Sequence, residues 1–190
     1  MLQLIIGLAI FLGMHSIAIV APQGRDRLFA QFGPLGWRAI YSIVSIAGFV
    51  LIVHGYAVAR LSPTMIWQPP AFMSHITALL MLPVFIFLVA AYMPGKIQSA
   101  LKHPMLVAVK LWALAHLLAN GMLADIILFG SFLAWAVVDR ISLKRRTQKA
   151  MVSMPVTGAN DIIAIIVGIG LYVAFVLHLH VALIGVRPIG

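Results

Sequence analysis

The sequence predicts an all-α membrane protein, a bundle of about six transmembrane helices that forms a single domain over residues 1–190. Two observations carry this prediction. Hydrophobic residues make up 63% of the 190 residues, and the mean hydropathy is +1.10, whereas soluble globular proteins use about 45–50% apolar residues. The apolar residues also gather into runs close to the roughly 20 residues that an α-helix needs to cross a bilayer.

Six such runs follow one another along the chain. They are Leu2–Ala21, Trp37–Ala59, Phe72–Met93, Pro104–Asn120, Leu123–Val138 and Ile162–Ile184. The fourth and fifth are separated only by a tight connection around Asn120-Gly121, which predicts an antiparallel hairpin. The most polar connection is Thr147–Asn160, and we expect it to be the most flexible one.

The distribution of basic residues predicts the orientation in the membrane. The odd-numbered connections and the adjoining helix ends hold Arg25, Arg27, Arg38, Lys96, Lys102, Lys110, Arg140, Lys144, Arg145, Arg146 and Lys149, whereas the other side holds only Arg60 and Arg187. Because basic loops stay in the cytoplasm, both termini are expected on the outer side. The net charge of +9 is therefore interpreted as a topology signal and as a means of contacting anionic lipid, with no nucleic-acid partner.

Several kinds of site are excluded by composition and motif. The chain has no cysteine, so disulfides, thiolate metal sites and iron–sulfur clusters are ruled out. The sequence has no nucleotide-binding loop, no Ser-His-Asp order and no H-E-x-x-H motif. A hydrolase of soluble substrates is disfavoured, and a substrate would enter from the lipid or be a small diffusible molecule.

Two histidines lie inside apolar runs, where an ionisable side chain is costly and is kept for a purpose. His116 shares one helix face with Trp112 and Asn120, because the three are spaced by four residues. His15 has only Ser16 as a polar neighbour. For each histidine two interpretations stay open: an axial haem ligand or catalytic group, or an interhelical hydrogen bond.

The positions of the two histidines along their helices are compatible with a shared ligand. Their α-carbons are expected to be offset by about 10 Å along the bundle axis, and neighbouring helices pack about 8–10 Å apart. A tilted macrocycle would fit between them, although the arithmetic does not require one. Of the other histidines, we expect His178 to face a neighbouring helix and His180 to reach the membrane interface.

The chain resembles the NnrU family of membrane proteins over nearly its whole length. The most specific match is the string Lys110-Leu111-Trp112-Ala113-Leu114-Ala115-His116-Leu117-Leu118-Ala119-Asn120-Gly121. Further matches are Met14-His15-Ser16, Arg25-Asp26, Trp37-Arg38-Ala39-Ile40-Tyr41-Ser42, Gly55-Tyr56, Trp67, Pro69-Pro70, Ala91-Tyr92-Met93-Pro94-Gly95-Lys96, His103-Pro104-Met105-Leu106, Leu128-Phe129-Gly130 and Asp139-Arg140.

The resemblance implies a cofactor and two kinds of function. Bacterial members are linked to denitrification, and a plant relative with the same domain, zeta-carotene isomerase, uses haem b to isomerise a cis double bond of a polyene. By that resemblance His15 and His116 would be the axial ligands of haem b, with Trp112 and Asn120 beside it. Ala113 stands where the plant enzyme has a cysteine, so a switch of the iron ligand from histidine to cysteine cannot operate here.

Three functional hypotheses follow. The first is a haem b protein of the bacterial inner membrane, linked to the reduction of nitrite and nitric oxide or to related redox chemistry. The second is a haem-dependent cis–trans isomerase of an apolar polyene. The third is a non-enzymatic assembly or transport factor for a respiratory membrane complex, in which the histidines serve helix packing. The sequence leaves open whether the protein is an enzyme.

Overall fold

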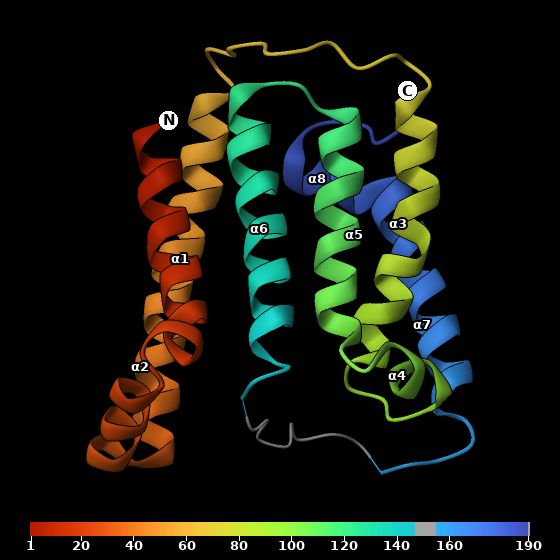
Figure 1. Cartoon of the computed structure of the whole chain (residues 1–190). Helices are drawn as coiled ribbons and strands as arrows, with labels where there is room; N and C mark the ends of the chain where they lie inside the picture. Colours follow the sequence, from red (N-terminus) through yellow and green to blue (C-terminus); the bar gives the residue numbers. More distant parts are fainter. Residues whose placement is uncertain (147–154, 190) are drawn as a thin grey trace.

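The structure, a computed structural model, describes residues 1–146 and 155–189. The described residues form helices and no extended strand, which confirms the predicted all-α class (Figure 1). The elements are α1 (Leu2–Val20), α2 (Pro22–Ala59), α3 (Met73–Ala90), α4 (Lys96–Leu101), α5 (Pro104–Ala119), α6 (Leu123–Ser142), α7 (Asn160–Ala174), the π-helix η1 (Phe175–Leu179) and α8 (His180–Ile184).

The protein is a multi-pass membrane bundle. Four described helical segments are long and apolar enough to cross a bilayer: α1, α2, α3 and the continuous rod formed by α7, η1 and α8. Helix α5 is apolar but shorter, and α6 carries Asp125, Asp139 and Arg140 toward its ends. These six rods run side by side between the two ends of the molecule (Figure 1).

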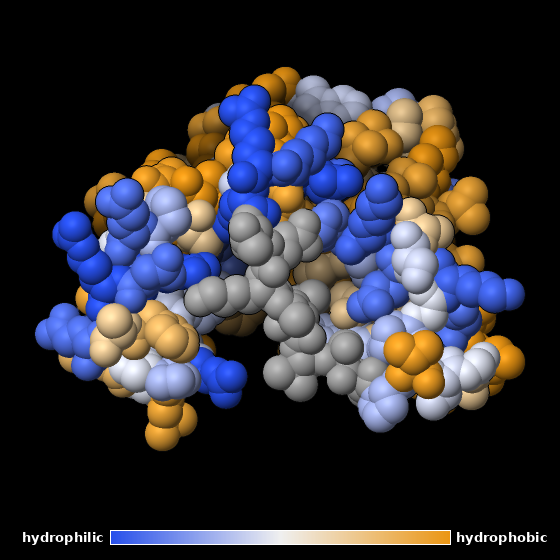
Figure 2. Space-filling view, turned by 60° about the horizontal axis from the view of Figure 1, so that its bottom comes forward, coloured by the Kyte–Doolittle hydropathy of each residue, from blue (hydrophilic) through white to orange (hydrophobic). Residues whose placement is uncertain are grey.

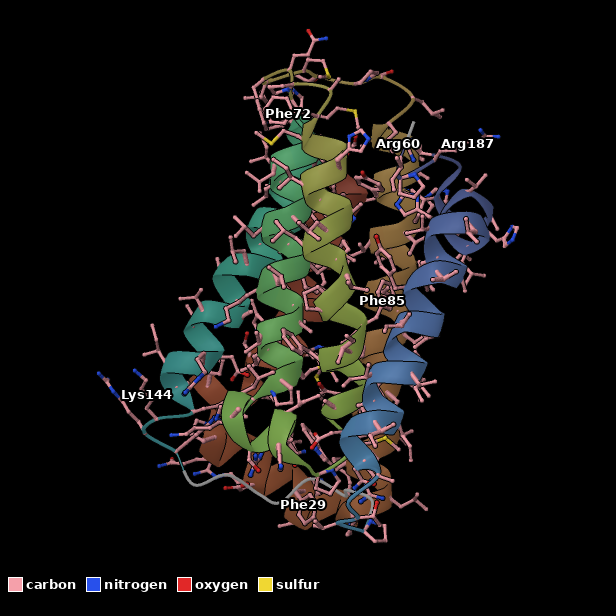
Figure 3. All side chains as sticks on the ribbon, turned by 90° about the vertical axis from the view of Figure 1, so that its right-hand side faces the viewer. Phe29, Arg60, Phe72, Phe85, Lys144 and Arg187 are labelled. Atoms are coloured by element: carbon pink, nitrogen blue, oxygen red, sulfur yellow. The ribbon has the colours of Figure 1, made fainter. Side chains whose placement is uncertain are left out.

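The two ends of the bundle differ in charge. Both termini lie at one end, which we call the terminal end (Figure 1). The opposite end, called the basic end, is formed by residues 22–32, α4 and residues 143–146, and hydrophilic side chains gather on it (Figure 2). Arg60 and Arg187 lie at the terminal end and Lys144 at the other (Figure 3). The termini therefore share a side as expected, while the assignment of that side to the cell exterior stays a prediction.

The second helix begins earlier than its apolar run predicted. Helix α2 starts at Pro22, not at Trp37, and its first part contains Arg25 and Arg27, which were expected in a loop. Proline suits the first turn of a helix because its missing N–H would have no partner there. The helix is interrupted at Gly33, which has φ +70° and precedes Pro34. Hydropathy alone misses the first segment because it is polar and lies at the basic end.

The short helix α4 was not predicted, and a contact distant in sequence holds it. The carboxylate of Asp161 accepts hydrogen bonds from the backbone N–H groups of Lys96 (2.8 Å) and Ile97 (3.0 Å). Asp161 belongs to the first turn of α7, so one side chain ties α4 to the start of the last rod. The polar connection Thr147–Asn160 lies for the most part outside the described residues, and its expected flexibility stays a prediction.

Helices α1 and α2 approach each other to backbone contact. A β-carbon at Gly7 would lie 2.6 Å from the backbone nitrogen of Ile52, and one at Gly48 would lie 2.8 Å from that of Phe11. One at Gly55 would overlap the backbone at Leu4. Small residues allow such close packing, which is the main source of helix association where lipid surrounds the protein.

We expect Gly55→Val to destabilise the protein by about 1–3 kcal/mol, because the new side chain would push α1 away from α2. The measurement is thermal unfolding in mild detergent followed by circular dichroism. Gly170→Val is the matched control, because an added β-carbon there meets no atom within 4 Å. Equal melting temperatures for the two variants would contradict the close packing.

The connection between α5 and α6 confirms the predicted hairpin and is covered by the loop before α3. The carbonyl of Gly121 accepts a hydrogen bond from the N–H of Ile66 (2.9 Å), and the N–H of Leu123 donates to the carbonyl of Thr64 (2.8 Å). A β-carbon at Gly121 would overlap the carbonyl of Trp67. Glycine at 121 therefore lets the loop and the hairpin turn meet at the terminal end.

Candidate functional site

A cavity of about 480 Å³ lies between α2, α3, α5, α6 and the segment of η1 and α8. We call it the main cavity. Its lining is largely apolar, and the polar side chains in it are Tyr56, Arg60, Trp112, His116 and His180. Binding sites for small molecules and cofactors have this character, with apolar walls, a few polar groups and volumes of about 300–1,000 Å³.

The main cavity has a rim that faces the surface of the bundle. Phe49, Val53 and Leu183 line it and are 54%, 51% and 67% exposed. In a bilayer this exposed apolar rim faces the lipid.

A second cavity of about 230 Å³, called the side cavity, adjoins the main one. Its polar lining comes from Ser74, Thr77, His116, Asn120, Tyr172, His180 and Arg187. Met81, Phe85, His116, Phe175 and His180 line both cavities. Figure 3 shows Phe85 on α3 facing the last rod, and its ring lies 5.0 Å from that of Phe175. The two histidines therefore stand where the more polar of the two cavities meets the more apolar one.

His116 is fixed by its own helix. Its Nδ1 lies 2.9 Å from the carbonyl oxygen of Trp112. Because a carbonyl can only accept, Nδ1 carries the hydrogen, and the neutral ring keeps its lone pair on Nε2. The ring stacks on Phe129 with centroids 4.7 Å apart. A histidine oriented in this way is suited to bind a metal through Nε2.

The other two residues predicted around His116 also lie at the cavities. Trp112 lines the main cavity and Asn120 the side cavity. The Asn120 side chain donates to the carbonyl of His116 (2.8 Å), so it closes the last turn of α5. The structure thus brings Trp112, His116 and Asn120 to one region, as their spacing predicted.

His15 lies apart from this region and lines neither cavity. Its Nδ1 donates to the carbonyl of Phe11 (2.7 Å), and its ring stacks on Phe11 at 4.1 Å. Tyr41 and Trp135 complete its surroundings, at 5.2 and 5.9 Å between ring centroids. His15 therefore occupies an aromatic cluster between α1, α2 and α6.

Three aromatic rings stand in series between the two histidines. Phe11 lies 5.7 Å from Phe132, Phe132 lies 5.4 Å from Trp112, and Trp112 lies 5.5 Å from His116. The two histidines also lie at different depths along the bundle axis, because the ring of His116 stacks on Phe129 whereas that of His15 contacts Trp135. These two residues are six apart on α6, which corresponds to about 9 Å and agrees with the expected offset. Whether the two histidines share a ligand stays a prediction.

The prediction for His178 is wrong, and His180 lies at the cavities. His178 is exposed, whereas His180 is partly buried and lines both cavities. The cause is η1, since a π-helix fits one extra residue into a turn and so rotates the following residues by about 100°. A straight α-helix was assumed in the prediction, and the apolar sequence Phe175–Leu179 gives no signal of the π-turn.

A buried carboxylate at the terminal end also escaped prediction as part of the site. Asp125 is fully buried, and Oδ1 accepts a 2.6 Å hydrogen bond from the hydroxyl of Tyr56, a cavity residue. Oδ2 accepts from the N–H of Met122 (3.0 Å). No group of three or more His, Asp or Glu side chains able to hold a metal ion occurs within residues 1–146 and 155–189.

A family model, described as NnrU protein, matches residues 3–188. The chain belongs to the NnrU family. The match covers both cavities and every predicted site residue of this NnrU protein. No curated protein and no solved structure matches the chain.

We expect Tyr56→Phe to lower the stability of this NnrU protein by about 1–3 kcal/mol, because a buried carboxylate would lose a hydrogen-bond donor. Unfolding in detergent followed by circular dichroism measures the effect. Tyr92→Phe is the control, since Tyr92 is 54% exposed and its change should stay within about 0.5 kcal/mol. A Tyr56→Phe protein as stable as the control would show that the bond contributes little.

Proposed function

We propose that this protein binds haem b in the bacterial inner membrane and serves redox chemistry linked to the reduction of nitrite and nitric oxide. Membership of the NnrU family supports the physiological part. The observation that carries the proposal is His116, whose Nδ1–H is held by a backbone carbonyl at the wall of a largely apolar cavity. Imidazole is a common axial ligand of haem iron.

The charged residues at the terminal end also suit this cofactor. Arg60 lines the main cavity and Arg187 the side cavity. Neither has a carboxylate partner among the described residues. Haem b combines an apolar macrocycle with two carboxylates, so its apolar body suits the walls and its carboxylates suit the arginines. When bound, haem b supplies an iron that exchanges single electrons and that small diatomic molecules can bind.

The experiment is to purify the protein in mild detergent after expression with a haem precursor and to record oxidised and reduced absorbance spectra. We expect a Soret band with sharp reduced α and β bands, because imidazole binds the iron. In His116→Ala the bound haem should fall to a small fraction of that in the parent. His54→Ala is the control, because His54 is hydrogen-bonded to the side chain of Gln3 and lines neither cavity.

A folded parent protein that stays colourless during haem titration would contradict the proposal. The histidines would then be packing groups. Copurification of a reductase or oxidase subunit would in that case favour the assembly or transport factor.

The lipid-facing rim of the main cavity favours a second candidate, the cis–trans isomerisation of an apolar polyene. Phe49, Val53 and Leu183 give a long apolar molecule a way in from the bilayer, and Trp112 in the wall would lie against it. Added carotenoid-type polyene should therefore quench the tryptophan fluorescence of the protein in nanodiscs, through energy transfer. Trp112→Phe should lower the saturable quenching more than Trp37→Phe does, because Trp112 lies in the cavity wall and Trp37 lines neither cavity. Equal quenching in both variants would argue against polyene binding in this cavity.

A further inference from the structure

One face of α3 lines the side cavity from the terminal end toward the middle of the bundle. Its lining residues are Ser74, Thr77, Ala78, Met81 and Phe85, and their spacing places them on one side of the helix. Ser74 and Phe85 are eleven positions apart, which corresponds to about 16 Å along the helix axis. The side cavity is therefore elongated and runs lengthwise between the helices.

The polarity of this cavity changes with depth. Ser74 and Thr77, nearest the terminal end, carry hydroxyl groups, whereas Met81 and Phe85 are apolar. Figure 3 shows Phe85 about halfway along the bundle. On the facing wall, Asn120 follows the last residue of α5 and adds an amide at the terminal end. Hydroxyl and amide groups suit contact with water, so the polar half of the side cavity lies toward the aqueous phase at the terminal end.

A positive charge lies at this polar half. Arg187 lines the side cavity and belongs to the terminal end (Figure 3). The turn after α8 brings it there, because Gly185 adopts φ +78°, a conformation that glycine takes at little cost. The carbonyl of Val186 accepts a 2.6 Å hydrogen bond from Nδ1 of His180, which holds the turn. Arg187 forms no ion pair with a carboxylate in the part of the chain that the structure describes.

The acidic side chains lie away from the side cavity. The chain has four. Asp26, Asp139 and Asp161 belong to the basic end, where the last two contact Arg146 and α4. Asp125 is at the terminal end but is fully buried. The charged side chains near the opening are therefore basic, and the potential that they create attracts anions.

The inner part of the side cavity also contains a polar group. Tyr172 of α7 lines it beside Phe85, with 6.3 Å between the ring centroids. Its hydroxyl makes no hydrogen bond within the described part of the chain, although a partly buried hydroxyl normally has a partner. Met81 and Phe85 line the main cavity as well, so a polar solute that reaches Tyr172 is next to the main cavity.

We propose that the side cavity takes up a small hydrophilic anion from the aqueous phase at the terminal end and leads it to the main cavity, with Arg187 as the charge that attracts it. The inference rests on the proposed function only for the reaction that follows in the main cavity. The volume of about 230 Å³ is several times the roughly 30 Å³ that a water molecule occupies in the liquid, so a solvated ion of a few atoms fits.

The test uses the full chain, which has no cysteine of its own, so a single introduced thiol reports on one position. Ala78→Cys places the thiol in the side cavity. Leu79→Cys is the matched control, because Leu79 is the next residue of α3, is 70% exposed and lines neither cavity. Both variants are expressed without haem precursor, placed in phosphatidylcholine nanodiscs and treated with charged thiosulfonate reagents. Ala78→Cys should react at least about tenfold faster, because a thiol reacts as the thiolate, which forms in water and not in lipid.

The charge of the reagent tests the role of Arg187. Rates are normalised to those of a free thiol in solution. At low salt a negatively charged sulfonate reagent should then label Ala78→Cys about three to five times faster than a positively charged ammonium reagent, because one nearby cation attracts the first and repels the second. Adding Arg187→Gln should bring this ratio close to one. Lys144→Gln, at the basic end (Figure 3), should leave it unchanged.

Two controls establish that the variants are comparable. Circular dichroism reports the fold, and labelling after denaturation shows that each thiol is present and reduced. Equal rates for Ala78→Cys and Leu79→Cys in folded protein would overturn the aqueous route, and a ratio unaffected by Arg187→Gln would overturn the attraction of an anion by Arg187. Because the rates are measured without haem, a chain that binds no haem can still show the route, and a chain without the route can still bind haem.

Discussion

The hydrogen bond from Tyr56 to Asp125 is the contact on which the main cavity depends. A carboxylate that is fully buried is strongly unfavourable unless donors surround it. Here the Tyr56 hydroxyl and the Met122 N–H satisfy it. Asp125 also lies in the first turn of α6, where the helix dipole favours a negative charge. Because α2 otherwise packs mainly against α1, this bond, together with the core cluster that Ile52 and Ala59 share with Leu128 and Phe129, joins α2 to α6 across the cavity.

A second polar contact joins α2 to α8. Arg60, at the end of α2, donates to the carbonyl of Ile184 at the end of α8 (2.9 Å), and its guanidinium lies 5.8 Å from the centre of the Tyr56 ring. These two hydrogen bonds hold the terminal end of α2 through the side chains of Tyr56 and Arg60. By contrast, α2 and α1 meet in direct backbone contact. The placement of glycine on α2 complements these bonds: α2 presents Gly48 and Gly55 to α1 and larger side chains such as Phe49 and Val53 to the cavity.

The sequence predicts well what depends on a single helix. The apolar runs locate the rods, Asn120-Gly121 locates the hairpin, and a spacing of four brings Trp112, His116 and Asn120 to one region. The sequence does not predict features that depend on local backbone conformation or on contacts between helices. Residues 22–32 form a helix that ends at the break of Gly33 and Pro34, although they lack an apolar run, and the π-turn that places His180 has no signal in an apolar stretch. The separation of His15 from His116 depends on aromatic rings supplied by three different helices, which no periodicity in one helix reveals.

The resemblance links two properties, haem binding and a switch of the iron ligand from histidine to cysteine, and the alanine at position 113 affects only the second. Ala113 is fully buried and belongs to the core cluster with Leu4, Leu128 and Phe129, and it lines neither cavity. A cysteine side chain at this position would lie in the packed core between the helices, one turn from His116. Its absence takes away a candidate iron ligand but leaves both cavities and both imidazoles at their junction unchanged. The two cavities of this chain are therefore physically independent of a switch between histidine and cysteine ligands, and the small, fully buried side chain at 113 belongs to the packed core around α5.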